Sequence, residues 1–316
     1  MNRSMKGFLI LLAASLTLAG CNKPDNEAAP VAEMDQPAQV TPPRSADELM
    51  ADKIDAVIAG SWRSPANKER DQSRHPKETL EFFGVNPGMT LIEITPGGGW
   101  YTEILAPLLK GSGHFHAAVA ASASSDYAKR GNDALLAKLT SDPQDYGVVS
   151  VDEFDPKAPA LGAPGSADMV LTFRNVHNWV GNDTAPQMFK AFFDVLKPGG
   201  VLGVVDHRAV AGSDIDAIKK SGYLPQEFVT KLAMDAGFTL AAQSEINANS
   251  KDTKDYEQGV WTLPPTYRLN DKDRAKYAAI GESDRMTLKF VKPAGDAIFN
   301  PADAKPDDNK PVPATP

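Results

Sequence analysis

Two groups of polar side chains follow apolar runs of this sequence, where they could act together on one ligand. The groups come after ADMVLTF and after VLGVV, and their members are Arg174, Asn175, His177 and Asn178, and Asp206, His207 and Arg208. An imidazole titrates near neutral pH and can act as a base or a ligand. A guanidinium can hold an anion through paired hydrogen bonds. We therefore predict catalytic roles for His177, His207 and Arg174.

The substrate is expected to be small or anionic. Arg174, Arg208 and Arg285 could each hold a carboxylate or a phosphate in a bidentate manner. We predict that Asn178, Asp206 and Arg208 bind the substrate.

Structural roles remain as alternatives for these residues. His207 would then be a hydrogen-bonded residue at the end of a strand, and His177 would belong to a polar loop that caps the next helix. Tyr101, which follows three glycines, is a further catalytic candidate, although a tyrosine there could equally belong to the packing. His114 and His116 alternate along one strand without a carboxylate or thiol at ligand spacing, so no metal site is predicted.

A run of glycines, Gly97 to Gly99, follows the apolar run LIEI and precedes a helical pattern. Glycine lets a backbone approach a ligand closely, and a helix N-terminus offers free N–H groups. The order strand, glycine-rich turn and helix is the context in which such a run binds a nucleotide-like cofactor. Further along, Lys197-Pro198-Gly199-Gly200 separates a helix from another strand.

Strand-like and helix-like segments alternate through most of the chain. We expect strands at 89–95, 113–120, 147–154, 201–209, 239–246 and 284–293 and one beginning at 167, and helices at 45–59, 100–110, 127–141, 184–200 and 224–238. This alternation favours a doubly wound, mostly parallel α/β sheet with helices on both faces. Asp71, Arg74 and His75 precede the first strand and belong either to a charged helix start or to a lid over the pocket.

These segments resemble the class I S-adenosylmethionine-dependent methyltransferases, from about Ile54 to Pro293. Glu93 to Gly99 (EITPGGG) looks like the first motif of that family, and Asp168 to Leu171 looks like its fourth-strand motif. In finer detail the chain is similar to predicted methyltransferases of the bacterial envelope, through PGGGWYTEILAP, VVDHRA and LPPTYR. The resemblance implies a Rossmann-like, seven-stranded sheet with an antiparallel final strand, and S-adenosylmethionine as the cofactor.

The resemblance also implies a set of cofactor-binding residues. They are Glu93, Thr95, Gly97, Gly98, Gly99, Asp152 and Asn175. The chain departs from the family in two places. Thr95 stands where the family often has its first glycine, and the second strand ends near Ala118 and Val119 without the acid that binds the ribose hydroxyls. Asp152 or Glu153 could still accept a hydrogen bond from the adenine amino group.

Three functions are therefore open. The first is a methyltransferase acting on a small molecule, and the second is a ligand-binding protein that keeps the fold with an eroded cofactor site. The third is a structural lipoprotein, which the density of His, Arg and Asn at the strand ends disfavours.

The N-terminus indicates export from the cytoplasm. Arg3 and Lys6 precede an apolar run at 8–18, and the sequence LAGC that ends at Cys21 looks like a bacterial lipobox. This implies cleavage before Cys21 and its lipidation, with an ordinary signal peptide as the alternative. We expect a signal peptide at 1–20, a flexible tether at 21–45, a methyltransferase-like domain at 46–293 and a disordered tail at 294–316. The lipid would anchor the chain in the cell envelope, at the outer membrane facing the periplasm.

The charge and the cysteine content limit which kinds of partner we expect for this chain. The net charge is −8 and no basic run stands out, which argues against nucleic acid. A single cysteine excludes a disulfide framework within the chain. The expected partners are a small-molecule substrate and a membrane reached through the lipid, and nothing in the sequence indicates an oligomeric state.

Overall fold

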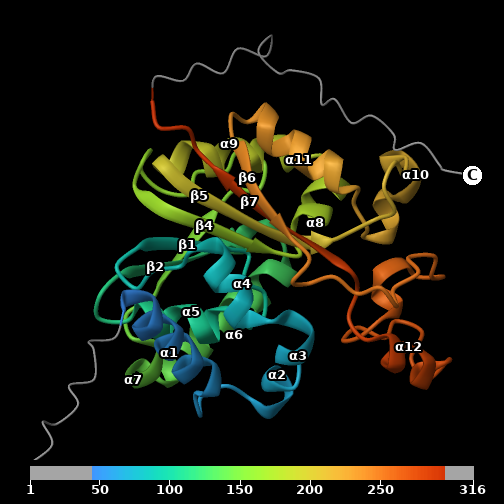
Figure 1. Ribbon diagram of the computed structural model, residues 1–316, viewed down its shortest axis with the longest axis horizontal. Coiled ribbons are helices and arrows are strands. Elements are labelled where there is room, and N and C mark those ends of the chain that lie inside the picture. Colours follow the sequence, from blue (N-terminus) through green and yellow to red (C-terminus); the bar gives the residue numbers. More distant parts are fainter. Residues whose placement is uncertain (1–44, 296–316) are drawn as a thin grey trace, which may run out of the picture. The chain divides into compact units, whose positions relative to one another are not determined.

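The computed structural model describes residues 45–295, and a seven-stranded sheet runs through the centre of this part (Figure 1). The strands are β1 (Thr90–Ile94), β2 (His114–Ala120), β3 (Ser150–Phe154), β4 (Ala167–Phe173), β5 (Leu196–His207), β6 (Thr239–Ser244) and β7 (Arg285–Val291). Their order across the sheet is β3-β2-β1-β4-β5-β7-β6. The chain therefore starts in the middle of the sheet, builds one half outward and then returns to build the other half.

Most neighbouring strands are parallel. β1 pairs with β2 and β4, β2 pairs with β3, and β4 pairs with β5 in this way, whereas β7 lies antiparallel between β5 and β6. The predicted doubly wound, mostly parallel sheet with an antiparallel final strand is thus confirmed. The direction of winding reverses between β1 and β4, and ligands bind at the carboxyl ends of the strands at such a point.

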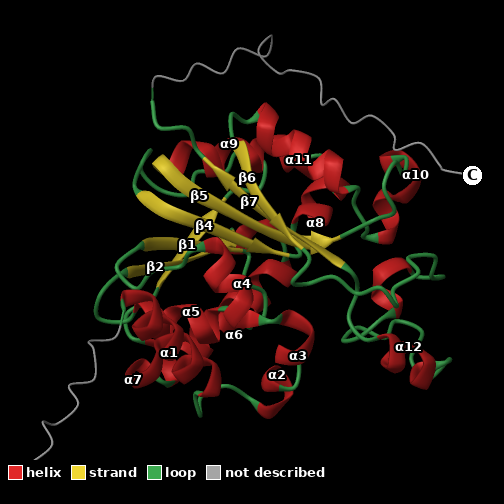
Figure 2. Cartoon of the chain, viewed as in Figure 1, coloured by secondary structure: helices red, strands yellow, loops and turns green. Residues whose placement is uncertain are grey.

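Helices cover both faces of the sheet (Figure 2). One face carries α8 (Val176–Gly181), α9 (Ala185–Val195) and α11 (Gln226–Asp235), and the other carries α1 (Ala46–Ala59), α4 (Pro76–Phe83), α5 (Thr102–Leu109) and α6 (Asp126–Ser141). Alternate residues of a strand point to opposite faces. Ile92 and Ile94 accordingly pack in the first cluster of buried side chains, and Leu91 packs in the second.

The segment before β1 is held against the start of α5. Trp62 Nε1 donates to the Glu103 carbonyl oxygen at 2.7 Å, and Trp100 Nε1 donates to the Asn67 carbonyl oxygen at 2.9 Å. Asn67 belongs to α2 (Pro65–Lys68), which is followed by α3 (Asp71–Arg74). These two indole contacts place α2 and α3 beside the glycine run.

Two segments differ from the sequence-based expectation. β5 begins at Leu196 and runs through the Lys-Pro-Gly-Gly turn, because Gly199 and Gly200 form backbone hydrogen bonds with Lys292 that extend the ladder with β7. The sequence indicates no element between the strand expected to end at 246 and the one expected to begin at 284. The structure has η3 (Gly259–Thr262) and α12 (Arg274–Ile280) there.

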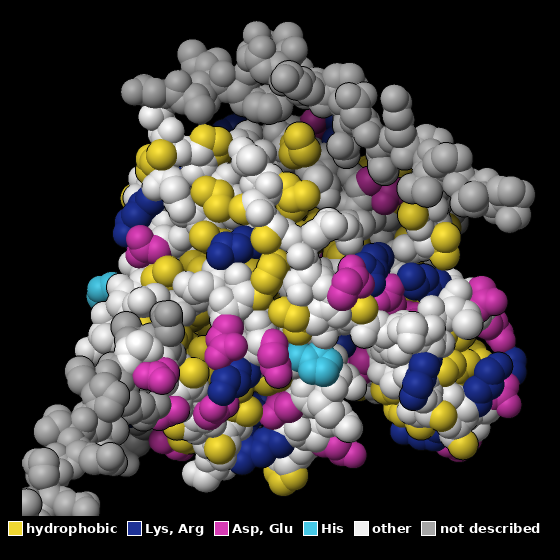
Figure 3. All heavy atoms as spheres, in the orientation of Figure 1, with side chains coloured by type: hydrophobic (Ala, Val, Ile, Leu, Met, Phe, Trp, Pro, Cys, Tyr) yellow, Lys and Arg dark blue, Asp and Glu magenta, His cyan; other side chains and the backbone are white. Residues whose placement is uncertain are grey.

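No helix of residues 45–295 combines the length and the apolar character that a membrane span requires. The predicted signal peptide and Cys21 lie outside the described residues, as do nearly all of the tether and the tail. On the face that Figure 3 displays, acidic and basic side chains are interspersed.

Candidate functional site

A glycine-rich turn leads from the carboxyl end of β1 into α5. Backbone φ is positive at Thr95 (50°), Gly97 (59°) and Gly99 (78°), a left-handed conformation that glycine adopts without strain. A Cβ atom added at Gly97 or Gly98 would meet nothing within 4 Å, so this backbone borders open space. Thr95 therefore keeps the conformation of the glycine it replaces, and a ligand can approach the turn closely.

Asn175, the residue before α8, fixes this turn. Its Nδ2 atom donates to the carbonyl oxygens of Ile94 at 2.9 Å and Thr95 at 3.3 Å, and to Thr172 Oγ1 at 3.2 Å. Asn175 was predicted to bind the cofactor. Its contacts show that it positions the backbone of the turn.

Glu93 lies under the turn, near the end of β1. Its side chain is buried and accepts a hydrogen bond from Thr102 Oγ1 at 2.6 Å. Burial raises the pKa of Glu93 to about 8, although Thr102 and Lys138 act in the opposite direction. The carboxyl group is therefore largely protonated at neutral pH.

A cavity of about 190 Å³ opens beside the turn. The predicted residues that line it are Glu93, Thr95, Gly97, Gly98, Tyr101, Arg174 and Asn175. Arg70 and Arg74 line it as well. The sequence indicates Arg74 as part of a charged helix start or a lid. Nothing in the local sequence of Arg70 separates that residue from other surface arginines.

Tyr101 is held by packing at the wall of this cavity. Its ring stacks on Phe173 with 3.5 Å between the ring centroids, and its hydroxyl donates to the Arg74 carbonyl oxygen at 3.4 Å. Burial raises the pKa of Tyr101 to about 12. The phenol therefore stays protonated, and its hydroxyl supports the backbone of Arg74.

Asp206 and two histidines form a buried group at the carboxyl end of β5. His177 Nδ1 lies 2.9 Å from Asp206 Oδ1, and the carboxylate also accepts from the backbone N–H groups of His177 at 3.2 Å and His207 at 2.7 Å. With Nδ1–H assigned as the donor to this carboxylate, the Nε2 atom of His177 has no hydrogen-bond partner among residues 45–295. Asp206 is fully buried and orients His177, and its substrate-binding role stays a prediction.

His207 stands beside this pair with a different environment. Its Nδ1 atom lies 2.5 Å from Ser283 Oγ, and its ring centroid lies 5.1 Å from that of His177. Burial, together with His177 and Arg174, holds the pKa of His207 well below its usual range. His207 is therefore a neutral imidazole at physiological pH.

The ligand atoms of His177, Asp206 and His207 lie within 4.8 Å of one another, a spacing that a metal ion could bridge. Arg174, Arg285 and Arg74 all act on His207 as positive charges. Such a field opposes a further positive charge at this group. The sequence-based expectation of no metal stays a prediction.

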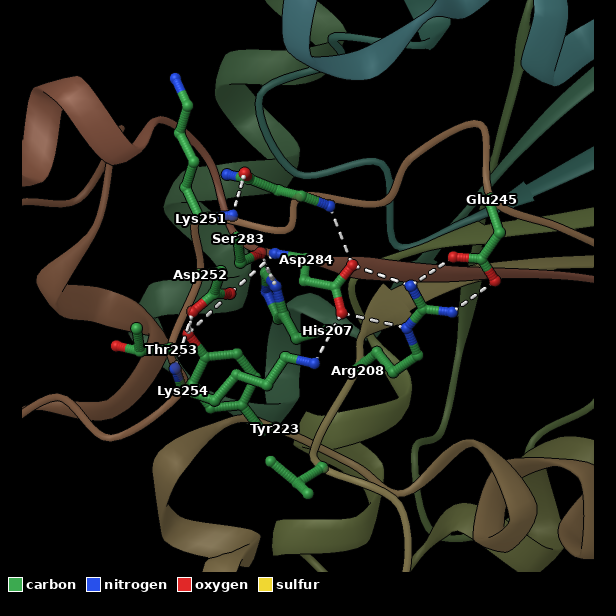
Figure 4. A network of polar contacts seen from close by, with 12 residues as sticks. His207, Arg208, Tyr223, Glu245, Lys251, Asp252, Thr253, Lys254, Ser283 and Asp284 are labelled. Carbon is green, nitrogen blue, oxygen red and sulfur yellow. Dashed lines mark hydrogen bonds and ion pairs between the residues drawn. The ribbon is translucent and has the colours of Figure 1, made fainter. Parts of the chain in front are cut away.

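Arg208 belongs to a separate network of charges (Figure 4). Its guanidinium contacts both carboxylate oxygens of Asp284, at 3.0 and 2.9 Å, and both of Glu245, at 2.7 and 2.6 Å. Lys254 also pairs with Asp284, at 2.8 Å. Arg208 does not line the cavity beside the glycine turn, and Asn178 is exposed on α8. Substrate binding by Arg208 and Asn178 stays a prediction.

Two acidic residues of β3, Asp152 and Glu153, lie beside β2. Asp152 Oδ2 lies 2.8 Å from His116 Nδ1, a partner that spacing in the sequence did not reveal. Glu153 accepts from the backbone N–H of Ser122 at 3.1 Å, just beyond β2. Carboxylates of β3 therefore lie beside β2, and the cofactor role of Asp152 stays a prediction.

No family model and no curated protein match this sequence. Solved structures do resemble it. A SAM-dependent methyltransferase from Aquifex aeolicus is 15% identical with a TM-score of 0.48, over 77% of this chain and 98% of that one. An arsenic(III) S-adenosylmethionine methyltransferase from Chlamydomonas reinhardtii is 15% identical with a TM-score of 0.42, over 76% and 73%. The [4+2]-cyclase SpnF is 14% identical with a TM-score of 0.48, over 75% and 86%.

The strand order, with an antiparallel last strand, is the arrangement that the resemblance to class I methyltransferases implied. Identities at this level concern the fold alone, and one fold hosts many activities. The function is therefore argued from the site.

Proposed function

We propose that this chain is an S-adenosylmethionine-dependent methyltransferase that acts on a small molecule. The observation that carries the proposal is the turn at 95–99. Three of its residues, one of them a threonine, are left-handed, and its glycines border an open cavity at the point where the winding of the sheet reverses. The left-handed conformation of Thr95 costs a branched residue energy, and the turn keeps its open shape in spite of that cost.

The residues of the site fit the cofactor. Gly97 and Gly98 leave room for close approach of a ligand to the backbone, and the neutral Glu93 beneath them can donate as well as accept a hydrogen bond. Glu153 of β3, which pairs with Val119 near the end of β2, would offer a carboxylate to the ribose edge. When bound, the cofactor supplies an activated methyl group on a sulfonium.

The chain's own residues would position the substrate and remove its proton. Methyl transfer depends largely on holding the nucleophile in line with the methyl group. His177 is oriented by Asp206 and carries a free Nε2 atom, which makes it the candidate general base. His207 stays neutral beside it and can accept or donate one hydrogen bond.

The second candidate is a ligand-binding protein with an eroded cofactor site. The observation in its favour is the end of β2, where Ala118, Val119 and Ala120 provide no acid. The same experiment decides between the two.

Calorimetric titration of the full chain with S-adenosylhomocysteine tests the proposal. Micromolar binding is expected for the native sequence. Gly98→Leu should abolish it, because a side chain there meets no protein atom within 4 Å of its Cβ and would fill the space for the ligand. Gly131→Leu on α6 is the matched control, since its Cβ also meets nothing. No binding by the native chain, or equal binding by both variants, would favour the second candidate.

We also propose that the chain is an envelope lipoprotein anchored through Cys21. The support is the lipobox-like sequence before Cys21 and the polar segment that follows it. In this setting, a small molecule of the envelope, or a substrate that is not yet exported, would meet the site.

A further inference from the structure

Four arginines from distant parts of the chain meet beside the cavity and surround Glu282. Arg70 Nε donates to Glu282 Oε1 at 2.6 Å, Arg74 Nε donates to Oε2 at 3.2 Å, and Arg285 Nη1 donates to Oε2 at 2.9 Å. Arg174, which follows β4, is the fourth arginine that acts on this carboxylate. We call these four arginines and Glu282 the arginine cluster.

The arginine cluster holds more positive than negative charge. Burial alone would raise the pKa of Glu282, but the four arginines outweigh it and lower the pKa to about 2, so the carboxylate is ionised. Asp206 also acts on Arg174, and it is already bonded to His177. Four positive charges against these two negative charges leave a surplus of two. Such a surplus in a buried place is costly unless an anion offsets it.

Several guanidinium N–H groups in the arginine cluster have no acceptor. The Nη2 atoms of Arg70 and Arg74 and the Nε atom of Arg285 are buried and lack a hydrogen-bond partner among the described residues. The Arg74 residue is only 4% exposed. The Arg174 side chain is partly exposed, and its guanidinium forms no hydrogen bond or ion pair within residues 45–295. Buried donors without acceptors are rare in proteins, and each one calls for an explanation.

Three of the four arginines line one space, whereas Arg285 borders a different cavity. Arg70, Arg74 and Arg174 all line the cavity of about 190 Å³ that the glycine turn borders. The guanidinium of Arg74 lies 4.6 Å from the centroid of the Trp100 ring, which supports it in place. Pockets for whole drug-sized ligands hold about 300–1,000 Å³. The smaller volume beside the arginines suits one charged group of a ligand, and a cofactor at the glycine turn would extend beyond this cavity.

We propose that Arg70, Arg74 and Arg174 bind an oxyanion, a carboxylate or phosphate group of the substrate, beside the glycine turn. A planar guanidinium can donate paired hydrogen bonds to either group. Within residues 45–295, the cavity lining contains arginines but no lysine or histidine. The anion site is a property of the described residues, whereas its assignment to the substrate rests on the proposed methyltransferase function.

An anion there also has a consequence for the cofactor. The sulfonium of S-adenosylmethionine is positively charged, and the surplus charge of the arginine cluster would repel it. A bound oxyanion offsets that repulsion, so substrate and cofactor should strengthen each other's binding. S-adenosylhomocysteine carries no sulfonium charge and should not show this effect.

The test is calorimetric and thermal-shift titration of the full chain with inorganic phosphate and with acetate, without cofactor. At least one of these anions is expected to bind and to raise the melting temperature. Arg174→Gln should weaken that binding by about tenfold or more, since it removes a charged donor from the site. The same variant should melt at a higher temperature without anion, because it removes a guanidinium that has no partner. A purely structural arginine would give the opposite result.

Matched controls separate the site from general charge effects. Arg268→Gln removes an arginine that also lies over an indole, 4.6 Å from the Trp261 centroid, but outside the cavity. It should leave anion binding unchanged. The preferred anion then identifies the group, phosphate or carboxylate.

Three outcomes would overturn the proposal. The first is that neither anion binds, and the second is that Arg174→Gln and Arg268→Gln behave alike. The third is displacement of the anion by S-adenosylhomocysteine, which would assign the site to the cofactor's carboxylate. Failure of S-adenosylhomocysteine to bind, with anion binding intact, would count against the methyltransferase and leave the anion site standing.

Discussion

At the scale of single residues, Thr95 holds a position of the backbone that suits glycine. Its φ of 50° is left-handed, and its β-branched side chain makes that conformation unfavourable. The residue is held there by hydrogen bonds on both sides. Its N–H donates to the Ala118 carbonyl oxygen at 2.7 Å, and its carbonyl oxygen accepts from Asn175.

We expect Thr95→Gly to raise the free energy of unfolding by up to about 1 kcal/mol. The left-handed conformation costs an L residue roughly 1–2 kcal/mol, and the greater freedom of glycine in the unfolded chain offsets part of the gain. Denaturant titration measures the change. Thr140→Gly on α6, where the backbone is helical, should lower stability. A loss of stability in both variants would contradict this account of Thr95.

Glu93 should make stability depend on pH. Its folded pKa of about 8 lies above its ordinary value of 4.5, so between these values the folded chain holds a proton that the unfolded chain has released. Stability therefore falls as pH rises through this window, by about 1.4 kcal/mol per pH unit for one proton. Glu93→Gln should remove that component from unfolding curves recorded between about pH 5 and 8.

The exposed Glu153 serves as the control for this experiment. Hydrogen bonds from Ser122 lower its pKa, so Glu153→Gln should not change the slope in the same window. If Glu93→Gln has the same pH slope as the native chain, Glu93 is not the buried acid described here.

Residues that belong to a local motif were found from the sequence, and residues that meet through the fold were not. Glu93 and the glycines belong to one short sequence run, from which we predicted that they lie together at the end of β1. Arg70 and Glu282 bond at 2.6 Å across 212 residues of sequence, and no local pattern in either segment indicates the other. The Asp206 carboxylate was predicted at the right edge of the sheet, but its burial under His177 depends on packing that the sequence alone does not show.

At the scale of elements, the network around Arg208 joins the end of β5 to the start of β7 and the loop after β6 (Figure 4). Asp252 accepts from Tyr223 Oη at 2.9 Å and from the backbone N–H of Asp284 at 2.7 Å. The segment that carries Glu282 is thereby attached to the sheet. Arg208 supports the arginine cluster from a distance.

We expect Arg208→Gln to lower the free energy of unfolding by about 1–3 kcal/mol, because Asp284 is buried and would lose its main counter-charge. Chemical denaturation measures this. Affinity for S-adenosylhomocysteine should stay the same. Lys231→Gln, which breaks an exposed pair with Asp235, should change stability by less than about 0.5 kcal/mol. Loss of ligand affinity at unchanged stability would instead support the predicted role of Arg208 in binding.

The elements themselves were predictable where periodicity is strong. The strands β1, β2 and β4 are short apolar runs bounded by turn residues, and the structure places them close to the expected ranges. Residues 245–284 have no such period, because few of them pack in a small apolar cluster around Val260 and many of their polar side chains bond to one another and to β5. Their place over the strand ends could not be derived from the sequence.

At the scale of the whole molecule, charge is distributed unevenly. The chain has a net charge of −8, yet the arginine cluster holds a positive surplus. Excess negative charge elsewhere keeps general anion binding weak, so anions should be attracted to one place rather than to the surface as a whole.

The proposed anchor gives a prediction at this scale. In a bacterium with an outer membrane, Cys21→Ser should move the full chain from the membrane fraction to the soluble fraction, because no other cysteine can carry the lipid. Fractionation followed by immunoblotting measures the shift. Asn26→Ala, in the same segment, should leave the chain in the membrane fraction. A Cys21→Ser chain that stays with the membrane would rule out the lipid as the anchor.

Asn175 has one consequence for the order of events in catalysis. Its side chain clasps the backbone of the glycine turn, and its own backbone begins the helix that bears His177. Asn175 thus links the glycine turn directly to the helix that carries the His177 imidazole. In the proposed enzyme, a ligand that holds the glycine turn would therefore also restrict the position of the His177 imidazole before a second reactant binds.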